Sequence, residues 1–198
     1  MKIDEESAYL LGALRDATID LREKKNYEIK IAQKDIRWLK LLQQLFEKYF
    51  QKLGRITNHV NNTSILRIND KTIVNEIAEI SEMKVPQDNW ETPLVIKNSP
   101  LPIQVAYLRG FFDAEGGLPK NPQTSKQKYL SLSQKNKESL EFLRNILIKM
   151  EFNPTNLTIC GKVWEFRLTR KKDILKFIEE IGSWHPEKRE RLKLLLIK

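Results

Sequence analysis

The sequence has only one cysteine, Cys160, and two histidines among its 198 residues. One cysteine cannot build a disulfide framework or a thiolate cluster for zinc. The histidines, His59 and His185, lie far apart and are expected at the surface or in turns. No apolar run approaches the about 20 residues of a membrane helix. The start, MKIDEESAYLL, is acidic where a secretory signal is basic, so we expect a cytoplasmic protein without a membrane partner.

Acidic residues are also fewer than basic ones. Lysine and arginine number 35 against 26 acids, which gives a net charge of +9 and a pI near 9.5. A surplus of this size indicates a polyanionic partner, nucleic acid above all. The alternative interpretation is that the charge serves solubility alone.

A duplicated segment organises the chain. The stretch SAYLLGALRDATIDL (residues 7–21) is repeated as VAYLRGFFDAEGGL (residues 105–118). Tyr9 and Tyr107 are 98 residues apart, and two later blocks match in the same order, with Gln33 opposite Gln134 at an offset of 101. In the last block Arg67 stands opposite Arg167. These matches indicate an internal duplication of roughly 95 residues rather than a solenoid.

Each copy predicts the same succession of elements: a helix, a strand, an amphipathic helix, a hairpin and a further helix. The halves are residues 1–84 and 103–198, and residues 85–102, which hold four prolines, predict a linker. The expected elements of the first half are helices 4–17, 34–53 and 71–83, a strand 27–33 and a hairpin turning at Asn61-Asn62. Those of the second are helices 101–115, 136–151, 171–181 and 187–197, a strand 129–134 and a hairpin turning at Gly161-Lys162.

Both copies keep a glycine inside the first helix, although glycine there costs about 1 kcal/mol relative to alanine. Close packing of two helices through these glycines explains the choice. We therefore predict an interface between the halves formed by Gly12 and Ala13 from one copy and Gly110 and Phe111 from the other. The carboxyl ends of the two helices would then lie side by side.

The second copy, LRGFFDAEG (Leu108–Gly116), resembles the motif of the LAGLIDADG homing endonuclease family, and the first, LLGALRDAT, matches it at the front only. Two motifs about 100 residues apart are typical of the family's single-chain form. The resemblance covers essentially the whole chain. It implies an α+β fold of two pseudo-symmetric αββαββα halves, each with a four-stranded antiparallel sheet, forming a saddle on double-stranded DNA. It also implies a monomer with pseudo-twofold symmetry.

The resemblance further implies that the last acid of each motif holds Mg²⁺, with Mn²⁺ as an alternative, for hydrolysis by metal-activated water. Glu115 occupies this position in the second motif. In the matching register Ala17 occupies it in the first motif, and Asp16, one residue early, points about 100° away. Thr18 replaces the closing glycine. We therefore expect weakened metal binding, and DNA binding with impaired or lost cleavage.

Three other functions stay open. The chain could be an active Mg²⁺-dependent endonuclease or nickase that uses Glu115 with Asp16 or Asp20. It could be a splicing maturase that binds structured intron RNA through the same basic surface. It could also be a regulatory DNA-binding module.

Further site residues are suggested by position in the resemblance. Gln33 and Gln134 match a polar residue that orients water, although either could simply cap the following helix. Lys188 resembles a late lysine near the active site, or is a solvated helix residue. Arg37 matches a basic residue one turn into a helix. The candidates for DNA contact are Lys24, Lys25, Lys30, Arg37, Arg55, Arg67, Lys120, Lys126, Lys128, Lys162 and Arg167.

Overall fold

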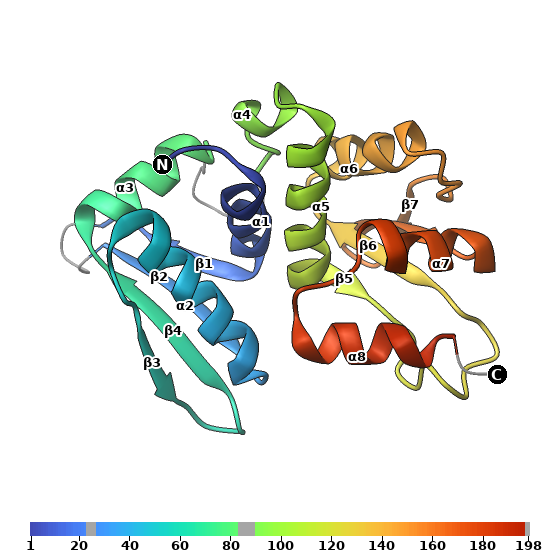
Figure 1. Ribbon diagram of the computed structural model, residues 1–198, viewed down its shortest axis with the longest axis horizontal. Helices are drawn as coiled ribbons and strands as arrows, with labels where there is room; N and C mark the ends of the chain where they lie inside the picture. The colour runs from blue at the N-terminus through green and yellow to red at the C-terminus, as the bar shows by residue number, and fades with distance from the viewer. Residues whose placement is uncertain (23–26, 83–89, 197–198) are drawn as a thin grey trace.

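The computed structural model describes residues 1–22, 27–82 and 90–196. It forms two halves on either side of a central pair of helices, and each half consists of an antiparallel sheet with helices packed on it (Figure 1). Lys24, Lys25, residues 85–89 of the predicted linker and Ile197 of the predicted last helix lie outside the described residues. No helix in the described part of the chain is long and apolar enough to cross a membrane.

The two halves repeat one order of elements. The first contains α1 (Glu5–Ala13), the 3₁₀ turn η1 (Leu14–Asp16), β1 (Ala17–Asp20), β2 (Glu28–Gln33), α2 (Ile36–Phe50), β3 (Arg55–Asn58), β4 (Ser64–Asn69) and α3 (Lys71–Ile80). The predicted linker, residues 85–102, contains a short helix that the sequence did not predict, α4 (Leu94–Lys97). The second half contains α5 (Leu101–Glu115), β5 (Gly116–Gly117), β6 (Leu130–Gln134), α6 (Lys137–Lys149), β7 (Thr158–Cys160), β8 (Val163–Leu168), α7 (Lys171–Glu180) and α8 (Pro186–Leu194). The strand orders are β1-β2-β4-β3 and β5-β6-β8-β7, so the predicted α+β fold of two four-stranded halves is confirmed.

Alternation along the strands separates a buried face from a polar one. In β2, Ile29 and Ile31 are fully buried, whereas Lys30 between them is half-buried. The register places Lys30 opposite Arg67 of β4, and Arg67 opposite Arg55 of β3. Because residues directly opposite in antiparallel strands share a face, these three cations lie on the polar side of the first sheet.

Side-chain caps fix where the helices begin. Asp4 and Ser7 form a reciprocal capping box at α1, and Asp35, Asp70 and Asn136 accept backbone N–H bonds at α2, α3 and α6. Such caps satisfy N–H groups that the first turn leaves without a partner. The first helix ends earlier than predicted, because the α-helix stops at Ala13, the 3₁₀ turn reaches Asp16 and Ala17 already opens β1.

The helices α1 and α5 pack against each other backbone to backbone between the halves (Figure 1). A Cβ atom on Gly12 would lie 2.2 Å from the carbonyl oxygen of Tyr107, and one on Gly110 would lie 2.0 Å from that of Tyr9. Both distances are shorter than any real Cβ contact. The two glycines therefore let the helix axes approach, as the duplicated motif suggested.

We expect Gly110→Ala to lower the free energy of unfolding by about 3 kcal/mol or more, at or above the upper end of ordinary overpacking, because the added methyl meets backbone. Chemical denaturation measures the change. The matched control is Gly161→Asn in the β7–β8 turn, where nothing lies within 4 Å of an added Cβ and φ is +63°. Asparagine tolerates that φ, so the control should stay within about 1 kcal/mol of wild type. Equal losses in the two variants would contradict the close approach.

Candidate active site and nucleic-acid interface

Two carboxylates meet where the central helices end. Asp16 is the last residue of η1 and Glu115 is the last residue of α5, and each directly precedes the first strand of its sheet. Both side chains line one pocket of about 310 Å³. The pair therefore lies at the seam between the halves, with one acid from each.

The structure corrects the register predicted for the first motif. Ala17 pairs with Ile31 and Gly116 pairs with Leu132, so Ala17 is the structural counterpart of Gly116, and Asp16 that of Glu115. The motif register assumed an α-helix throughout. A 3₁₀ turn rises about 2.0 Å per residue against 1.5 Å, so three residues cover the height of four. Asp16 thus reaches the seam instead of pointing away, and Ala17 is buried in β1, 1% exposed.

Asp20, the other candidate acid of the first half, does not join the pocket. It closes β1 and accepts from the guanidinium of Arg22 at 2.6 Å. The two carboxylates of the pocket are therefore Asp16 and Glu115.

The two predicted glutamines stand beside these acids. Gln33, at the end of β2, donates through Nε2 to the carboxylate of Asp16. Gln134, its counterpart at the end of β6, lines the pocket that contains Glu115, and its Oε1 accepts from the backbone N–H of Lys135 at 2.9 Å. One amide from each half thus flanks the carboxylate pair.

Lys188 of α8 reaches the same place from the far end of the sequence. Its Nζ donates to the carbonyl oxygens of Phe112 and Gly116, both at 2.7 Å. These carbonyls flank Glu115 at the end of α5. An ammonium has three donors, so one remains after these two bonds. Lys188 is half-buried and is not the solvated helix residue that the alternative prediction described.

The electrostatics of the three groups follow from their burial and proximity. Burial, and then the negative charge of Asp16, raise the pKa of Glu115 to about 7. Burial also raises the pKa of Asp16, against the effects of the Gln33 hydrogen bond and the charge of Lys188. Burial lowers the pKa of Lys188 to about 8, although Asp113, Asp16 and Glu115 favour its charge. Partly buried acids whose negative charges repel each other and raise a pKa are typical of functional sites.

The donor set suits a hard divalent cation. Mg²⁺ is usually bound through one or two carboxylates together with water and substrate phosphates. Asp16 and Glu115 supply two carboxylates in a pocket open to solvent, and a cation would relieve their mutual repulsion. No group of three or more potential acidic, histidine or cysteine ligands occurs among the described residues, so a bound ion would depend on oxygens from a substrate.

Another carboxylate, that of the buried Asp113, joins the two halves near the site. It is 1% exposed and accepts from the hydroxyl of Tyr9 at 2.7 Å, which crosses the seam. It also accepts from the Ser183 hydroxyl and from the backbone N–H groups of Trp184 and His185 at 2.8 and 2.9 Å. Asp113 therefore ties α1 of the first half to the segment that leads into α8.

Arg15 occupies the equivalent motif position in the first copy and binds the equivalent tyrosine. Its Nη2 donates to the Tyr107 hydroxyl at 2.6 Å, and its Nη1 donates to the Trp90 carbonyl at 2.9 Å. Each motif thus fixes the tyrosine of the other motif, once with a carboxylate and once with a guanidinium. In the sequence, only the repeated tyrosines, Tyr9 and Tyr107, reveal this pseudo-symmetry. Their partners do not match, because one is an acid and the other a base.

Residues 183–194, which we call the α8 arm, belong to the second half in sequence and contact both halves. The backbone N–H of Glu187 donates to Asp35 at 3.1 Å, and Arg37 forms an ion pair with Glu190 at 2.8 Å. His185 stacks on Trp38 with ring centroids 4.8 Å apart. Of the two predicted settings, surface or turn, His185 takes the second, since it lies in the bend before α8 and is 4% exposed, whereas His59 is exposed.

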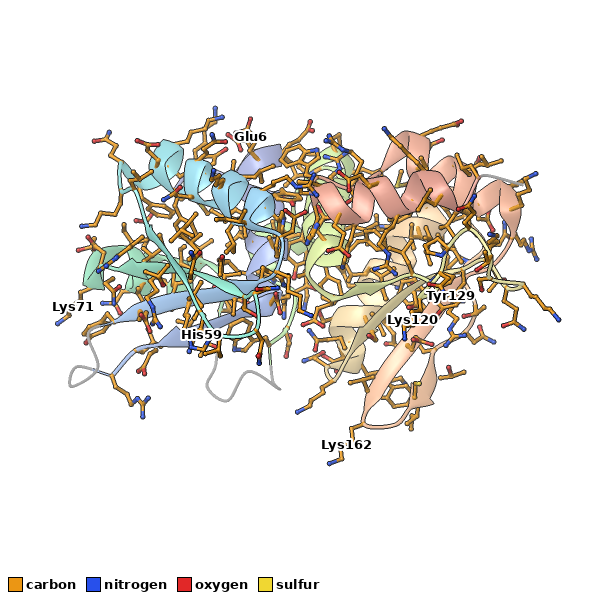
Figure 2. All side chains as sticks on the ribbon, turned by 90° about the horizontal axis from the view of Figure 1, so that it is seen from below. Glu6, His59, Lys71, Lys120, Tyr129 and Lys162 are labelled. Atoms are coloured by element: carbon orange, nitrogen blue, oxygen red, sulfur yellow. The ribbon has the colours of Figure 1, made fainter. Side chains whose placement is uncertain are left out.

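The predicted DNA-contacting cations fall into three groups. Lys30, Arg55, Arg67 and Arg167 lie on strands. Lys120, Lys126 and Lys162 are exposed in loops and turns of the second half, and Figure 2 shows Lys162 extending from its hairpin away from the body of the protein. Arg37 lies apart from both groups, on α2, where Asp35 and Glu190 hold its guanidinium.

Lys128 forms hydrogen bonds within its own loop: it donates to the carbonyl oxygen of Gln123 at 2.8 Å and to that of Pro122. It therefore shapes the loop between β5 and β6. The loop lysines Lys120 and Lys126 remain the exposed charges of that segment.

The raised pKa of Glu115 gives a testable pH dependence in the absence of metal. Its folded pKa of about 7 exceeds the ordinary value of about 4.3, so the folded state binds this proton more tightly and stability falls as pH rises from 5 to 7.5. We expect Glu115→Gln to remove this loss, gaining on the order of 1–2 kcal/mol over wild type between the two pH values. Denaturation in chelator at both pH values measures it, with the exposed Glu138→Gln as control. Parallel behaviour of Glu115→Gln and wild type would contradict the assignment.

Comparisons with known proteins agree with this geometry. Residues 102–182 match the family described as the LAGLIDADG-like domain. The homing endonuclease I-ApeI of Aeropyrum pernix is 30% identical over 95% of this chain and 86% of its own. I-DmoI in complex with DNA and Mn superposes with a TM-score of 0.68 at 22% identity, over 93% of this chain and 99% of that one. I-WcaI bound to its DNA recognition sequence gives 0.68 at 18% identity, over 100% and 89%. The chain belongs to the LAGLIDADG homing endonuclease family.

Proposed function

We propose that this protein is a site-specific endonuclease of double-stranded DNA that uses Mg²⁺ or Mn²⁺ and works as a monomer. The observation that carries the proposal is the meeting of Asp16 and Glu115 in one pocket at the seam. One chain supplies both acids, so a second copy is not needed to complete the site. The premise of an impaired site, an alanine in place of an acid, does not fit the arrangement of β1 and η1.

The bound metal would supply Lewis acidity and an activated water for in-line attack on a phosphodiester. Asp16 and Glu115 would hold it through carboxylate oxygens. Gln33 fixes the orientation of the Asp16 carboxylate, and Gln134 offers a second amide on the Glu115 side. Such supporting contacts keep ligands in a productive geometry.

In this proposal Lys188 acts on charge that develops at the phosphate. Its two bonds to the end of α5 fix the ammonium beside Glu115, and its remaining N–H would stabilise an oxyanion more strongly in this partly desolvated site than in water. The low dielectric that lowers its pKa also strengthens that interaction.

Three substitutions test whether the proposed metal site is intact or lacks an acid. Asp16→Asn and Glu115→Gln should each reduce cleavage more than about 100-fold, since even outer-shell partners of a metal contribute 10- to 100-fold. Ala17→Asp should give no gain and should destabilise the fold, because position 17 is buried beneath the helices. The substrate is a duplex selected from a randomised library by binding, incubated with Mg²⁺ or Mn²⁺.

Denaturing gels that resolve each strand distinguish a double-strand cut from a nick, and gel shifts in chelator report binding separately. Cleavage that appears only in Ala17→Asp would show that Ala17 occupies the metal position and would overturn the proposal. Binding without cleavage in wild type would favour the regulatory module. Preferential retention of structured intron RNA over the duplex would favour the maturase.

Lys188→Met should slow cleavage about 100-fold or more, the lower end for the loss of one donor to a developing oxyanion, with DNA affinity changed less than about threefold. Lys193→Met, on the exposed side of the same helix, is the matched control and should cleave as wild type does. Single-turnover rates at saturating enzyme measure the step directly. Equal rates for the two variants would remove Lys188 from the site.

A further inference from the structure

The polar face of the first sheet carries three cations in one row. The register puts Lys30 of β2 opposite Arg67 of β4, and Arg67 opposite Arg55 of β3. Neighbouring strands lie about 4.8 Å apart, so the row extends about 10 Å across the sheet. The major groove of B-DNA is about 12 Å wide and accepts such a surface.

This row is costly without an anionic partner. Like charges directly opposite each other in a sheet destabilise it. Glu28 neutralises Arg67 through a 2.6 Å ion pair, but Lys30 and Arg55 have no carboxylate partner within the ranges that the structure describes. Two uncompensated cations, one on each side of Arg67 on an open strand face, indicate that electronegative groups of a ligand meet them.

The equivalent row of the second sheet is nearly uncharged. Ser131 and Arg167 stand where Lys30 and Arg67 stand in the first half, and the pairing of β7 with β8 ends at Glu165, so no residue of β7 takes the place of Arg55. Arg167 is held by Glu165 at 2.6 Å and lies 4.7 Å from the centre of the Tyr129 ring. The exposed cations of this half are in its loops and turns instead, where they would meet phosphates.

The ion pair of Arg67 with Glu28 matches a G·C base pair better than a phosphate. A guanidinium fork fits O6 and N7 of guanine, and a carboxylate accepts from the N4 amino group of cytosine. A carboxylate beside a phosphate would instead be repelled. Arg55 and Lys30 flank the pair and favour further guanine acceptors in the adjoining positions.

We infer that the target site is asymmetric, with a guanine-rich half read by Lys30, Arg67 and Arg55, and a half bound by the second sheet that depends more on phosphate contacts. The inference rests on the proposed binding of duplex DNA but not on cleavage. Arg167 then accounts for a single G·C preference in the second half-site. The loop lysines supply affinity without sequence preference.

The test begins with selection of randomised duplexes by the full chain in chelator, so that cleavage plays no part. The single exposed cysteine, Cys160 at the end of β7, marks the second half. An iron-chelate reagent attached to it cuts nearby DNA by hydroxyl radicals and thereby identifies the half-site beneath the second sheet. The constrained guanines should concentrate in the other half-site.

Variants then assign the positions. Arg67→Lys, which keeps the charge but loses the fork, should weaken binding to the selected site about 10- to 100-fold and relax the preference at one base pair. Arg55→Ala should relax a neighbouring position, and Arg167→Lys a position in the second half-site. Lys40→Ala, which removes an exposed charge from α2, is the control and should leave the base preferences unchanged.

Three results would overturn the inference. Guanines shared equally between the half-sites, or concentrated beside Cys160, would remove the asymmetry. An Arg55→Ala variant that weakens every duplex alike and lowers the salt slope by about 1 would identify a phosphate contact instead. Failure of wild type to enrich any duplex would overturn the proposed DNA function together with this inference.

Discussion

The close contact between α1 and α5 is the constraint on which the rest of the molecule depends. Gly12 and Gly110 remove the side-chain layer that normally separates two helices, so each backbone meets the other directly. This distance decides where the two helix ends emerge, and the carboxylates sit at those ends. It also brings Tyr9 within reach of Asp113 and Tyr107 within reach of Arg15. Packing and chemistry are therefore set by the same few atoms.

In the first motif, the position of the acid along the helix axis depends on the rise per residue and not only on the number of residues after the glycine. Its acid follows the glycine by four residues where the second motif needs five. The tighter turn η1 compensates for the missing residue. A partly desolvated carboxylate pair is also a liability for the metal-free fold, since burial and like charge both oppose ionisation of Glu115. The contact between α1 and α5 imposes that cost, since it holds the two acids at one seam.

Sequence reasoning predicted the duplication, the fold and the glycine contact, because each leaves a periodic or repeated signal. It misplaced Asp16, because aligning the two copies assumed equal helical geometry in both. It missed the roles of Asp113, Arg15 and His185, whose partners lie between 70 and 150 residues away in sequence and depend on how the halves dock. Only the tyrosine repeated in both motifs hinted at the bonds across the seam.

The α8 arm gives the molecule a final asymmetry. By sequence it belongs to the second half, yet Trp38, Asp35 and Arg37 of the first half hold it, while Lys188 within it grips the end of α5. Each duplicated unit is thus incomplete as a building block. A chimaera that exchanges one half for that of a relative must carry a compatible arm across the junction, or its new helix pair will form without the lysine that binds the end of α5. The two halves are therefore not independent units, because the α8 arm, which begins at residue 183, contacts both of them.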